Sequence, residues 1–205
     1  MRIEPLPGRI RLVAGADLAF SPDGEHCLAG LVVYDLEKGC VVEETLAWRP
    51  ARFPYVPGLL SFREIPAVLA AARRLRTEPD VFMFDGQGYA HPRRVGLASH
   101  AGLVLGRPTI GAAKSRLIGE HAEPPGAAGS HAPLVDRGEI VGAVLRTRTG
   151  IRPIYVSVGH RVTLENAIAI CMACATSYRL PEPTRLAHHL VTRNRRLGPC
   201  SVGTH

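Results

Sequence analysis

The chain has 205 residues, of which 46% are hydrophobic and 21% are charged, which is the composition of a globular protein. No uninterrupted apolar stretch approaches the roughly 20 residues of a membrane span, and the first residues lack the apolar core of a signal peptide, so we expect a cytoplasmic protein. The formal net charge of +7 predicts an anionic partner, with nucleic acid as the first candidate.

Three strands are predicted at the start of the chain. Runs rich in β-branched and apolar residues alternate there with the turn-forming segments SPDGEH and DLEKG, an order typical of an antiparallel meander. A loop with several prolines follows. A helix then begins at Ser61, and Glu64 stands three residues further on, at the spacing of a capping box. The predicted strands span residues 13–20, 27–34 and 41–48, the loop 49–60 and the helix 61–76.

After residue 80 the predicted strands alternate with helices. A strand, a helix and a strand in succession form a βαβ unit, so this part of the sheet should be parallel. These elements are predicted over 81–85, 95–105 and 109–113, and are followed by a flexible loop over 120–133, strands that can pair over 139–146 and 153–158, and helices over 163–178 and 182–196. We therefore expect an α/β protein with a ribonuclease H-like mixed sheet, in which three antiparallel strands are followed by parallel strands, flanked by helices. Residues 1–196 would form this single domain, and residues 197–205 a disordered tail.

Carboxylates interrupt apolar segments at two places. Asp17 lies inside the first predicted strand, and Asp85 ends the strand that begins at Val81. A buried carboxylate costs desolvation free energy unless a cation or hydrogen-bond donors compensate it. Glu64 has the capping box as its alternative role, and His188 in the last predicted helix adds an imidazole. Together the three carboxylates and the histidine suit a divalent metal and two-metal phosphodiester hydrolysis.

A lysine and a glycine-rich turn accompany these carboxylates. Lys114 follows the strand over 109–113, where it would stabilise charge on a scissile phosphate or deprotonate water; an ordinary surface charge is the alternative. Gly86 and Gly88 would let a flat ring approach the backbone closely, and His91 would bond to that ring or to a phosphate; a plain tight turn is the alternative. The segment GRPTIGAAKS is not a phosphate-binding P-loop, because two alanines separate its second glycine from the lysine.

A stiff aromatic tip is predicted in the segment RFPYVPG. Pro54 and Pro57 stand on either side of Tyr55 and Val56, so the backbone is restricted and the ring is presented at low entropic cost. Such a tip could wedge between bases and hold a duplex open. The alternative is a turn that packs Tyr55 onto the protein's own core.

Arginine residues recur where a phosphate backbone would run. Arg93 and Arg94 stand beside the acidic segment, and Arg116 follows Lys114. Guanidinium groups suit phosphate because they offer several donors in a planar fork. These positions agree with the nucleic-acid partner that the net charge predicts.

Five blocks of the sequence together resemble endonuclease V, a family of repair nucleases that recognise deaminated purines. The resemblance runs from Arg11 to Arg196, which is nearly the whole chain, and the second and third blocks are highly specific. The blocks are AGADLAF (14–20), PYVPGLLSFRE (54–64), FDGQGYAHPRRVGLASH (84–100), GAAKSRL (111–117) and PEPTRLAH (181–188).

The resemblance implies a Mg²⁺-dependent endonuclease, with Mn²⁺ as a substitute, that acts in DNA repair on strands containing deoxyinosine. It would cut the second phosphodiester bond 3′ to the hypoxanthine and leave a 3′-hydroxyl and a 5′-phosphate. The implied metal ligands are Asp17, Glu64, Asp85 and His188, and the implied catalytic residues are Asp17, Glu64, Asp85 and Lys114. The implied wedge consists of Pro54, Tyr55, Val56 and Pro57, and the implied base pocket of Gly58, Leu60, Gly86, Gly88, His91 and Leu117.

Three other functions remain open from the sequence. An inosine-specific endoribonuclease acting on single-stranded RNA would use the same pocket and metal ligands. A non-catalytic reader of inosine-containing strands would bind without cleaving, although such a protein has no need to gather four metal-type ligands. A metal-independent hydrolase with a cysteine and a histidine is more remote. In each case we expect a monomer that acts without a membrane partner.

Overall fold

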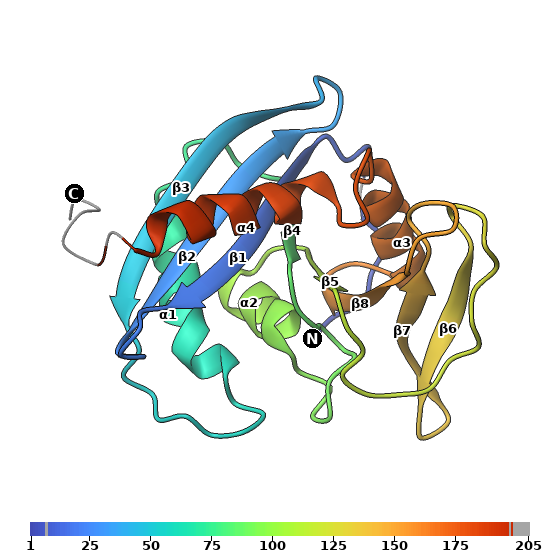
Figure 1. Ribbon diagram of the computed structural model, residues 1–205, viewed down its shortest axis with the longest axis horizontal. Helices are drawn as coiled ribbons and strands as arrows, with labels where there is room; N and C mark the ends of the chain where they lie inside the picture. The colour runs from blue at the N-terminus through green and yellow to red at the C-terminus, as the bar shows by residue number, and fades with distance from the viewer. Residues whose placement is uncertain (7, 197, 199–205) are drawn as a thin grey trace.

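The computed structural model describes residues 1–6, 8–196 and 198, and within them one eight-stranded sheet is flanked by four helices (Figure 1). The strands are β1 (Leu12–Phe20), β2 (His26–Asp35), β3 (Cys40–Pro50), β4 (Val81–Phe84), β5 (Thr109–Ala113), β6 (His131–Asp136), β7 (Glu139–Leu145) and β8 (Ile154–His160). The helices are α1 (Ser61–Ala72), α2 (Leu97–Leu105), α3 (Leu164–Ala173) and α4 (Glu182–Asn194). The predicted disordered tail over 197–205 lies outside the described residues, apart from Gly198.

The sheet combines both strand directions, as predicted. Its strand order is β3-β2-β1-β4-β5-β8-β7-β6. The first three strands form the antiparallel meander, and β4 and β5 then run parallel to β1, with α2 as the connection between them. Beyond β5 the pairing becomes antiparallel again, through β8, β7 and β6. The carboxyl ends of β1, β4 and β5 therefore meet at one edge of the sheet, where ligand sites of such sheets form.

One predicted element was wrong. The segment expected to be a flexible loop over 120–133 ends in the strand β6, which pairs with β7, and Glu120 forms a bridge with Val135. Pro133 lies within this strand and weakens a sequence signal for it. A proline is tolerated there because β6 is the last strand of the sheet, so the missing N–H breaks no central ladder.

Two helices are shorter than predicted. α1 ends at Ala72 rather than at residue 76, and α3 ends at Ala173 rather than at residue 178. After α1, the backbone N–H groups of Arg76 and Thr77 donate to the two carboxylate oxygens of Glu43, at 2.9 and 2.8 Å. If α1 continued, these N–H groups would donate to carbonyls of the preceding helical turn. The contact with Glu43 takes the place of that turn, and the local sequence does not reveal it.

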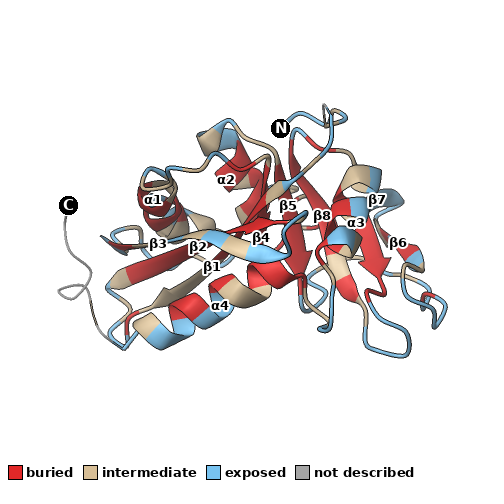
Figure 2. Ribbon diagram, turned by 90° about the horizontal axis from the view of Figure 1, so that it is seen from above, coloured by how far each residue is buried: buried red, intermediate tan, exposed pale blue. Residues whose placement is uncertain are grey.

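Helices cover both faces of the sheet. Figure 2 shows α1 and α2 on one side and α4 on the other, with buried strands between them. The strands supply both cores by alternation: Ala14 and Ala16 of β1 pack toward α1 and α2, whereas Val13 packs in the cluster that contains the buried residues of α3. Asp17 follows Val13 by four positions, so it points to the face covered by α3 and α4.

Two glycines let α4 lie directly on β1 and β2. A Cβ atom at Gly15 would lie 2.0 Å from the backbone carbonyl of Pro183, and one at Gly30 would lie 2.6 Å from Cγ2 of Val191. No side chain fits at such separations. The small residues therefore bring the helix close to the sheet, and His188 near its middle lies over the end of β1 that carries Asp17.

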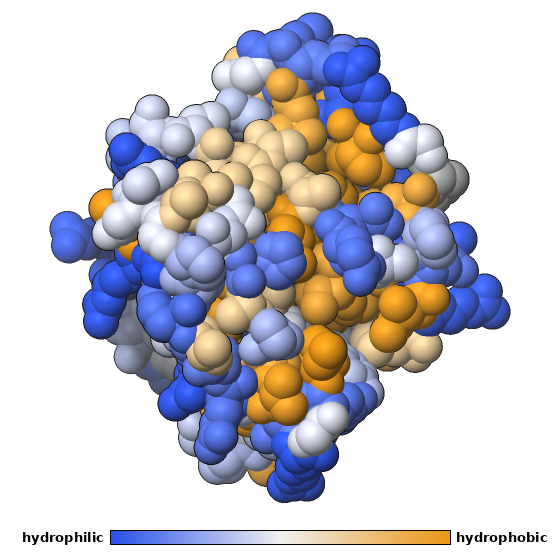
Figure 3. Space-filling view, turned by 90° about the vertical axis from the view of Figure 1, so that its right-hand side faces the viewer, coloured by the Kyte–Doolittle hydropathy of each residue, from blue (hydrophilic) through white to orange (hydrophobic). Residues whose placement is uncertain are grey.

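The surface of the described part of the chain is mixed in character. On the face that lies to the right in Figure 1, a band of hydrophobic residues runs between hydrophilic ones (Figure 3). Apolar atoms always make up part of a folded protein's surface, so a band of this kind is ordinary. Among the described residues, no helix is long and apolar enough to cross a membrane.

Candidate active site

The register of two parallel strands brings Asp17 and Asp85 together. Ala16 of β1 pairs with Phe84 of β4, and the N–H of Asp85 donates to the carbonyl of Ala16 at 3.2 Å. The next residue on each strand is a carboxylate. Both side chains are partly buried, with exposed fractions of 14% for Asp17 and 11% for Asp85. Desolvation is therefore the largest influence on the Asp17 carboxyl and raises its pKa, and the charge of Asp85 raises it further.

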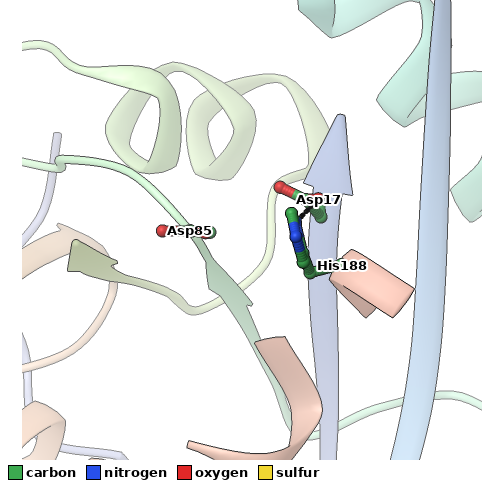
Figure 4. A group of neighbouring side chains, drawn as sticks. All are labelled: Asp17, Asp85 and His188. Carbon is green, nitrogen blue, oxygen red and sulfur yellow. Dashed lines mark hydrogen bonds and ion pairs between the residues drawn. The ribbon is translucent and has the colours of Figure 1, made fainter. Parts of the chain in front are cut away.

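His188 completes a compact group with the two aspartates. Its Nδ1 lies 2.9 Å from Oδ2 of Asp17, although 171 positions separate the two residues (Figure 4). One ligand atom from each of Asp17, Asp85 and His188 lies within 4.8 Å of the other two, so these side chains could hold a metal ion. The two carboxylates supply the oxygen donors that hard divalent cations prefer, and the imidazole adds one nitrogen donor.

Glu64 approaches from the helix on the opposite side of the sheet and lies outside this compact group. The Glu64 carboxyl has no hydrogen bond or ion pair among the described residues. Burial raises its pKa to about 7, and the charge of Asp17 contributes in the same direction. A nearby cation would reverse that shift, because it stabilises the ionised carboxylate.

The capping box predicted for Ser61 and Glu64 is wrong. Leu60 is the N-cap of α1, and no side chain caps it. The hydroxyl of Ser61 instead lies 3.0 Å from Nδ1 of His100 on α2. A capping role therefore does not explain Glu64. Among the described residues its partly buried carboxylate is unpaired, and it faces the compact group that contains Asp17.

Lys114, which directly follows β5, lies against one of these carboxylates, Asp85. Its Nζ is 2.5 Å from Oδ2 of Asp85, and its side chain is 40% exposed. It is therefore not an isolated surface charge: it partly neutralises Asp85 and remains accessible to a ligand. With His188 on Asp17 and Lys114 on Asp85, each aspartate of the group has one partner from the chain itself.

A pocket of about 330 Å³ opens directly beside Glu64 and Asp85. Most of the residues predicted for the base pocket line it: Gly58, Leu60, Gly86, His91 and Leu117. A Cβ atom at Gly86 would meet only the Leu97 side chain, at 3.6 Å, so the backbone of Gly86 is accessible to a ligand. Burial, followed by the charge of Arg93, lowers the pKa of His91, so a neutral imidazole faces the pocket. Its Nδ1 accepts from the backbone N–H of Arg93 at 3.2 Å, which leaves Nε2–H as a donor.

Gly88 does not line this pocket. Its N–H donates to Oγ of Ser157 at 2.8 Å, and a Cβ atom there would lie 2.1 Å from the carbonyl oxygen of Val158. The absence of a side chain at Gly88 therefore serves the packing of the turn against β8. Its predicted place in the wall of a base pocket does not fit this geometry.

Tyr55 lies at the mouth of the pocket and is 67% exposed. The alternative in which its ring packs onto the protein's own core is therefore wrong. Pro54, Val56 and Pro57, which flank it in the predicted wedge, are not among the residues that line the pocket. Phe62, in the first turn of α1, supports this loop: its ring stacks on Phe53 with centroids 5.1 Å apart.

Gln87 lines the pocket and was not singled out from the sequence. Its Nε2 donates to the carbonyl of Ser115 at 2.9 Å, while its Oε1 is buried without a partner among the described residues. A buried acceptor without a partner carries a desolvation cost. Its position between two glycines was the only sequence signal, because the contact with Ser115 spans 28 positions.

The chain is similar to proteins of one family over nearly its whole length. The family model described as Endonuclease V matches residues 2–189. Endonuclease V of Trichormus variabilis is 53% identical over 183 residues, which are 89% of this chain and 83% of that protein. The crystal structure of endonuclease V from Streptomyces avermitilis has 45% identity and a TM-score of 0.91, over 95% of this chain and 86% of that one. That similarity confirms the predicted ribonuclease H-like fold.

A more distant structure contains nucleic acid. Ciona intestinalis endonuclease V was crystallised in complex with a 24mer DNA containing an inosine followed by a ribo-adenosine. It has 27% identity and a TM-score of 0.81, and the match covers 95% of this chain and 92% of that chain. Taken with the family match and the relatives at about half identity, these similarities show that the chain belongs to the endonuclease V family and is an endonuclease.

Proposed function

We propose that this chain is a Mg²⁺-dependent endonuclease that recognises hypoxanthine in DNA. It hydrolyses the second phosphodiester bond 3′ to the lesion and leaves a 3′-hydroxyl and a 5′-phosphate. The observation that carries the proposal is the position of the compact group of Asp17, Asp85 and His188 beside a pocket large enough for a purine. The inosine-containing DNA bound to the Ciona intestinalis relative supports the same substrate.

The metal proposed for this site is Mg²⁺, with Mn²⁺ as a substitute. Asp17 and Asp85 would be its main ligands, with Glu64 and His188 at its edge. The raised pKa values of Asp17 and Glu64 fit this assignment: burial first, and the neighbouring carboxylate charge second, disfavour the ionised forms, and a cation would offset both effects. A divalent cation bound here would ionise a water molecule and polarise the scissile phosphate.

The chain's own cations would act on the substrate phosphate. Lys114 can leave Asp85 when a cation binds that carboxylate, since its side chain is partly exposed and flexible. Its ammonium group would then donate to a nonbridging oxygen and stabilise the charge that builds up during attack. The low exposure of Asp17 and Asp85 strengthens these electrostatic interactions, because little water screens them.

The lesion would be held by backbone groups and one imidazole. Gly86 offers close approach to a flat ring, and the neutral His91 offers its Nε2–H as a donor at the pocket wall. Gly58, Leu60 and Leu117 would enclose the base. The exposed Tyr55 would take the place of the flipped base in the stack, so the segment 54–57 would act as the strand-separating wedge.

Inosine in single-stranded RNA is the second candidate substrate. The Ciona intestinalis complex holds a ribonucleotide directly after the inosine. A metal-independent cysteine hydrolase is disfavoured. Cys27, Cys171 and Cys174 are buried with raised thiol pKa values, so they hold few thiolates, and the exposed Cys40 begins the edge strand β3 and does not line the pocket.

A cleavage panel tests the proposal. Wild-type protein is incubated with matched DNA and RNA oligonucleotides containing inosine or adenosine, with Mg²⁺ or with a chelator, and each nick is mapped to one nucleotide. We expect Mg²⁺-dependent cuts only in inosine-containing strands, at the second bond 3′ to the lesion. Asp85→Asn should slow the reaction at least about 100-fold, whereas Asp23→Asn, in the exposed turn before β2, should not. Cleavage by Asp85→Asn at the wild-type rate would overturn the proposal, as would cuts without a metal.

A further inference from the structure

A second pocket adjoins the base pocket along the segment 114–117, whose residues line one or the other. Its volume is about 460 Å³, and polar groups dominate its lining. Lys114 lines this pocket and Leu117 lines the base pocket, so one short segment separates the two. The charged side chains that line the second pocket are Lys114, Arg116, Glu123, Arg146, Arg152 and Arg179.

Three of these guanidinium groups have no carboxylate partner within the described part of the chain. Lys114 pairs with Asp85 at 2.5 Å, and Arg146 pairs with Glu123 at 2.5 Å. Arg116, Arg152 and Arg179 form no ion pair with any residue that the structure describes. The pocket therefore carries an excess of positive charge that the protein itself does not compensate, in a concave site where solvent screens it less than on an open surface.

Arg179 connects the second pocket to the candidate active site through the backbone of Lys114. Its Nη2 donates to the carbonyl of Lys114 at 2.6 Å and to that of Pro153 at 2.8 Å, while its Nε is buried without an acceptor. Burial and the charge of Arg152 both lower the pKa of the Arg179 guanidinium. A site that crowds two arginines in this way is stabilised when an anion enters it.

A structural role explains Arg146 but not the other arginines. The Arg146 side chain is only 7% exposed and donates to the carbonyls of Pro124, Pro125 and Ile151, so it joins the loop before β6 to the turn before β8. Arg116 and Arg152 are exposed and make no hydrogen bond through their side chains among the described residues. They are free to bind a ligand, and a phosphate is the anion that best fits several guanidinium forks.

We infer that the pocket lined by Arg116, Arg152 and Arg179 binds the phosphodiester groups of the substrate strand immediately 3′ to the scissile bond. The inference rests on the proposed function. A strand whose lesion occupies the base pocket would pass Lys114 at the scissile phosphate, and Lys114 also lines the second pocket. The ligand of this pocket is therefore the phosphate backbone on the 3′ side of the cut. The pocket binds it through its charge, whatever the bases are.

The test combines two arginine variants with charge-neutral substrates. Single-stranded DNA carrying one inosine is prepared with a single methylphosphonate, placed at the first or second phosphate 3′ to the cut or at a phosphate 5′ to the inosine. Arg152→Gln and Arg116→Gln are compared with wild type and with Arg9→Gln, which removes an equal charge from a residue that pairs with Glu37 outside this pocket. KM and kcat are measured at several salt concentrations.

On unmodified DNA, each pocket variant should raise KM about 5-fold while kcat changes by less than about 2-fold. The slope of log KM against log salt should fall by about 0.7 for each lost phosphate contact. On the substrate with a 3′ methylphosphonate the variants should match wild type, because the contacted charge is already absent. A methylphosphonate 5′ to the inosine should leave their defect intact, and Arg9→Gln should behave as wild type throughout.

Either of two results would overturn the inference. One is an unchanged KM for both variants; the other is a defect that persists with every 3′ methylphosphonate. The proposed function fails separately, since wild type would then not cut the unmodified inosine strand at all. Because Arg116 and Arg152 are exposed, neither substitution should alter folding, and matching thermal unfolding curves for the variants and wild type confirm this.

Discussion

Lys114 Nζ lies 2.5 Å from Oδ2 of Asp85, so the cation that follows β5 neutralises the carboxylate that follows the neighbouring parallel strand β4. The two residues are 29 positions apart and meet because β4 and β5 end at the same edge of the sheet. A metal bound to Asp85 must compete with this ammonium group. Lys114 therefore weakens metal binding to Asp85 by competing for it, and favours catalysis by stabilising a substrate phosphate.

Lys114→Ala separates these two effects. Without the competing ammonium, the variant should bind Mg²⁺ at least as tightly as wild type, as measured by calorimetric titration. Single-turnover cleavage of an inosine strand should nevertheless slow by about 100-fold, because a donor to the phosphate is lost. Lys38→Ala is the matched control, since Lys38 is the only other lysine in the chain and lies in the exposed turn after β2. Weaker Mg²⁺ binding by Lys114→Ala would contradict the competition.

His188→Ala tests the edge of the proposed metal site. His188 is 48% exposed and bonded to Asp17, so its loss should weaken metal binding and cleavage by about 10-fold rather than abolish them. The measurement is the Mg²⁺ concentration that gives half-maximal cleavage. His189→Ala, which changes the next exposed residue of α4, should have no effect. Equal effects of the two substitutions would mean that His188 has no special role.

Alanine substitutions at Gly86 and Gly88, which follow Asp85, should have different effects on stability and on substrate binding. Gly88→Ala places a Cβ atom 2.1 Å from the Val158 carbonyl oxygen, so we expect a loss of about 3 kcal/mol in the free energy of unfolding. Gly86→Ala meets only Leu97 at 3.6 Å and should cost less than about 1 kcal/mol. The methyl group at Gly86 narrows the base pocket, so KM for inosine DNA should rise while stability is retained. Urea unfolding and steady-state kinetics distinguish the two, and a reversed order would refute these assignments.

The sequence alone points to Asp17 and Asp85 as site residues. Each is a charged residue next to or inside an apolar strand, and a carboxylate in such a place needs a compensating partner. Apolar and β-branched runs bounded by turn residues also predict β1 to β5 to within one or two residues. β6 was missed because Pro133 weakens the strand signal, and only its place at the edge of the sheet makes that proline acceptable. Local pattern does not contain that information.

Tertiary contacts account for the remaining differences. The spacing of Ser61 and Glu64 fits a capping box, yet the Ser61 hydroxyl bonds to His100 on another helix. Gly88 was expected to face a ligand, but it packs against β8, 70 positions away. Arg152 and Arg179 lie far apart in the sequence and meet only in the folded chain. Each case depends on a partner distant in sequence, which composition and periodicity cannot indicate.

Tyr55→Ala tests the proposed wedge. The ring is 67% exposed, so the free energy of unfolding should change by less than about 0.5 kcal/mol. If the ring replaces the flipped base in a duplex, cleavage of double-stranded inosine DNA should fall by about 10-fold, since base–aromatic stacking is worth 1–3 kcal/mol. Single-stranded DNA needs no strand separation and should be cut more nearly as wild type. Equal losses on the two substrates would exclude a strand-separating role.

His100 should make the folded state sensitive to acid. Its Nδ1 lies 3.0 Å from the Ser61 hydroxyl and its ring packs on Phe62, and burial lowers the pKa of the imidazole below its ordinary value near 6.5. Below pH 6.5 the unfolded chain therefore takes up a proton that the folded chain resists. Stability is fully present above that pH and is lost as the pH falls toward the folded-state pKa.

Urea unfolding at pH 7.5 and 5.5 measures this contribution. Wild type should lose more stability between the two values than His100→Asn does, because asparagine does not titrate and keeps a polar group near Ser61. His91 and His160 also have lowered pKa values, so both proteins should still lose some stability in acid. The difference between the two proteins isolates His100. If they lost equal stability, the partly buried His100 imidazole would not be coupled to folding, and the support that α2 gives to the start of α1 would depend on packing alone.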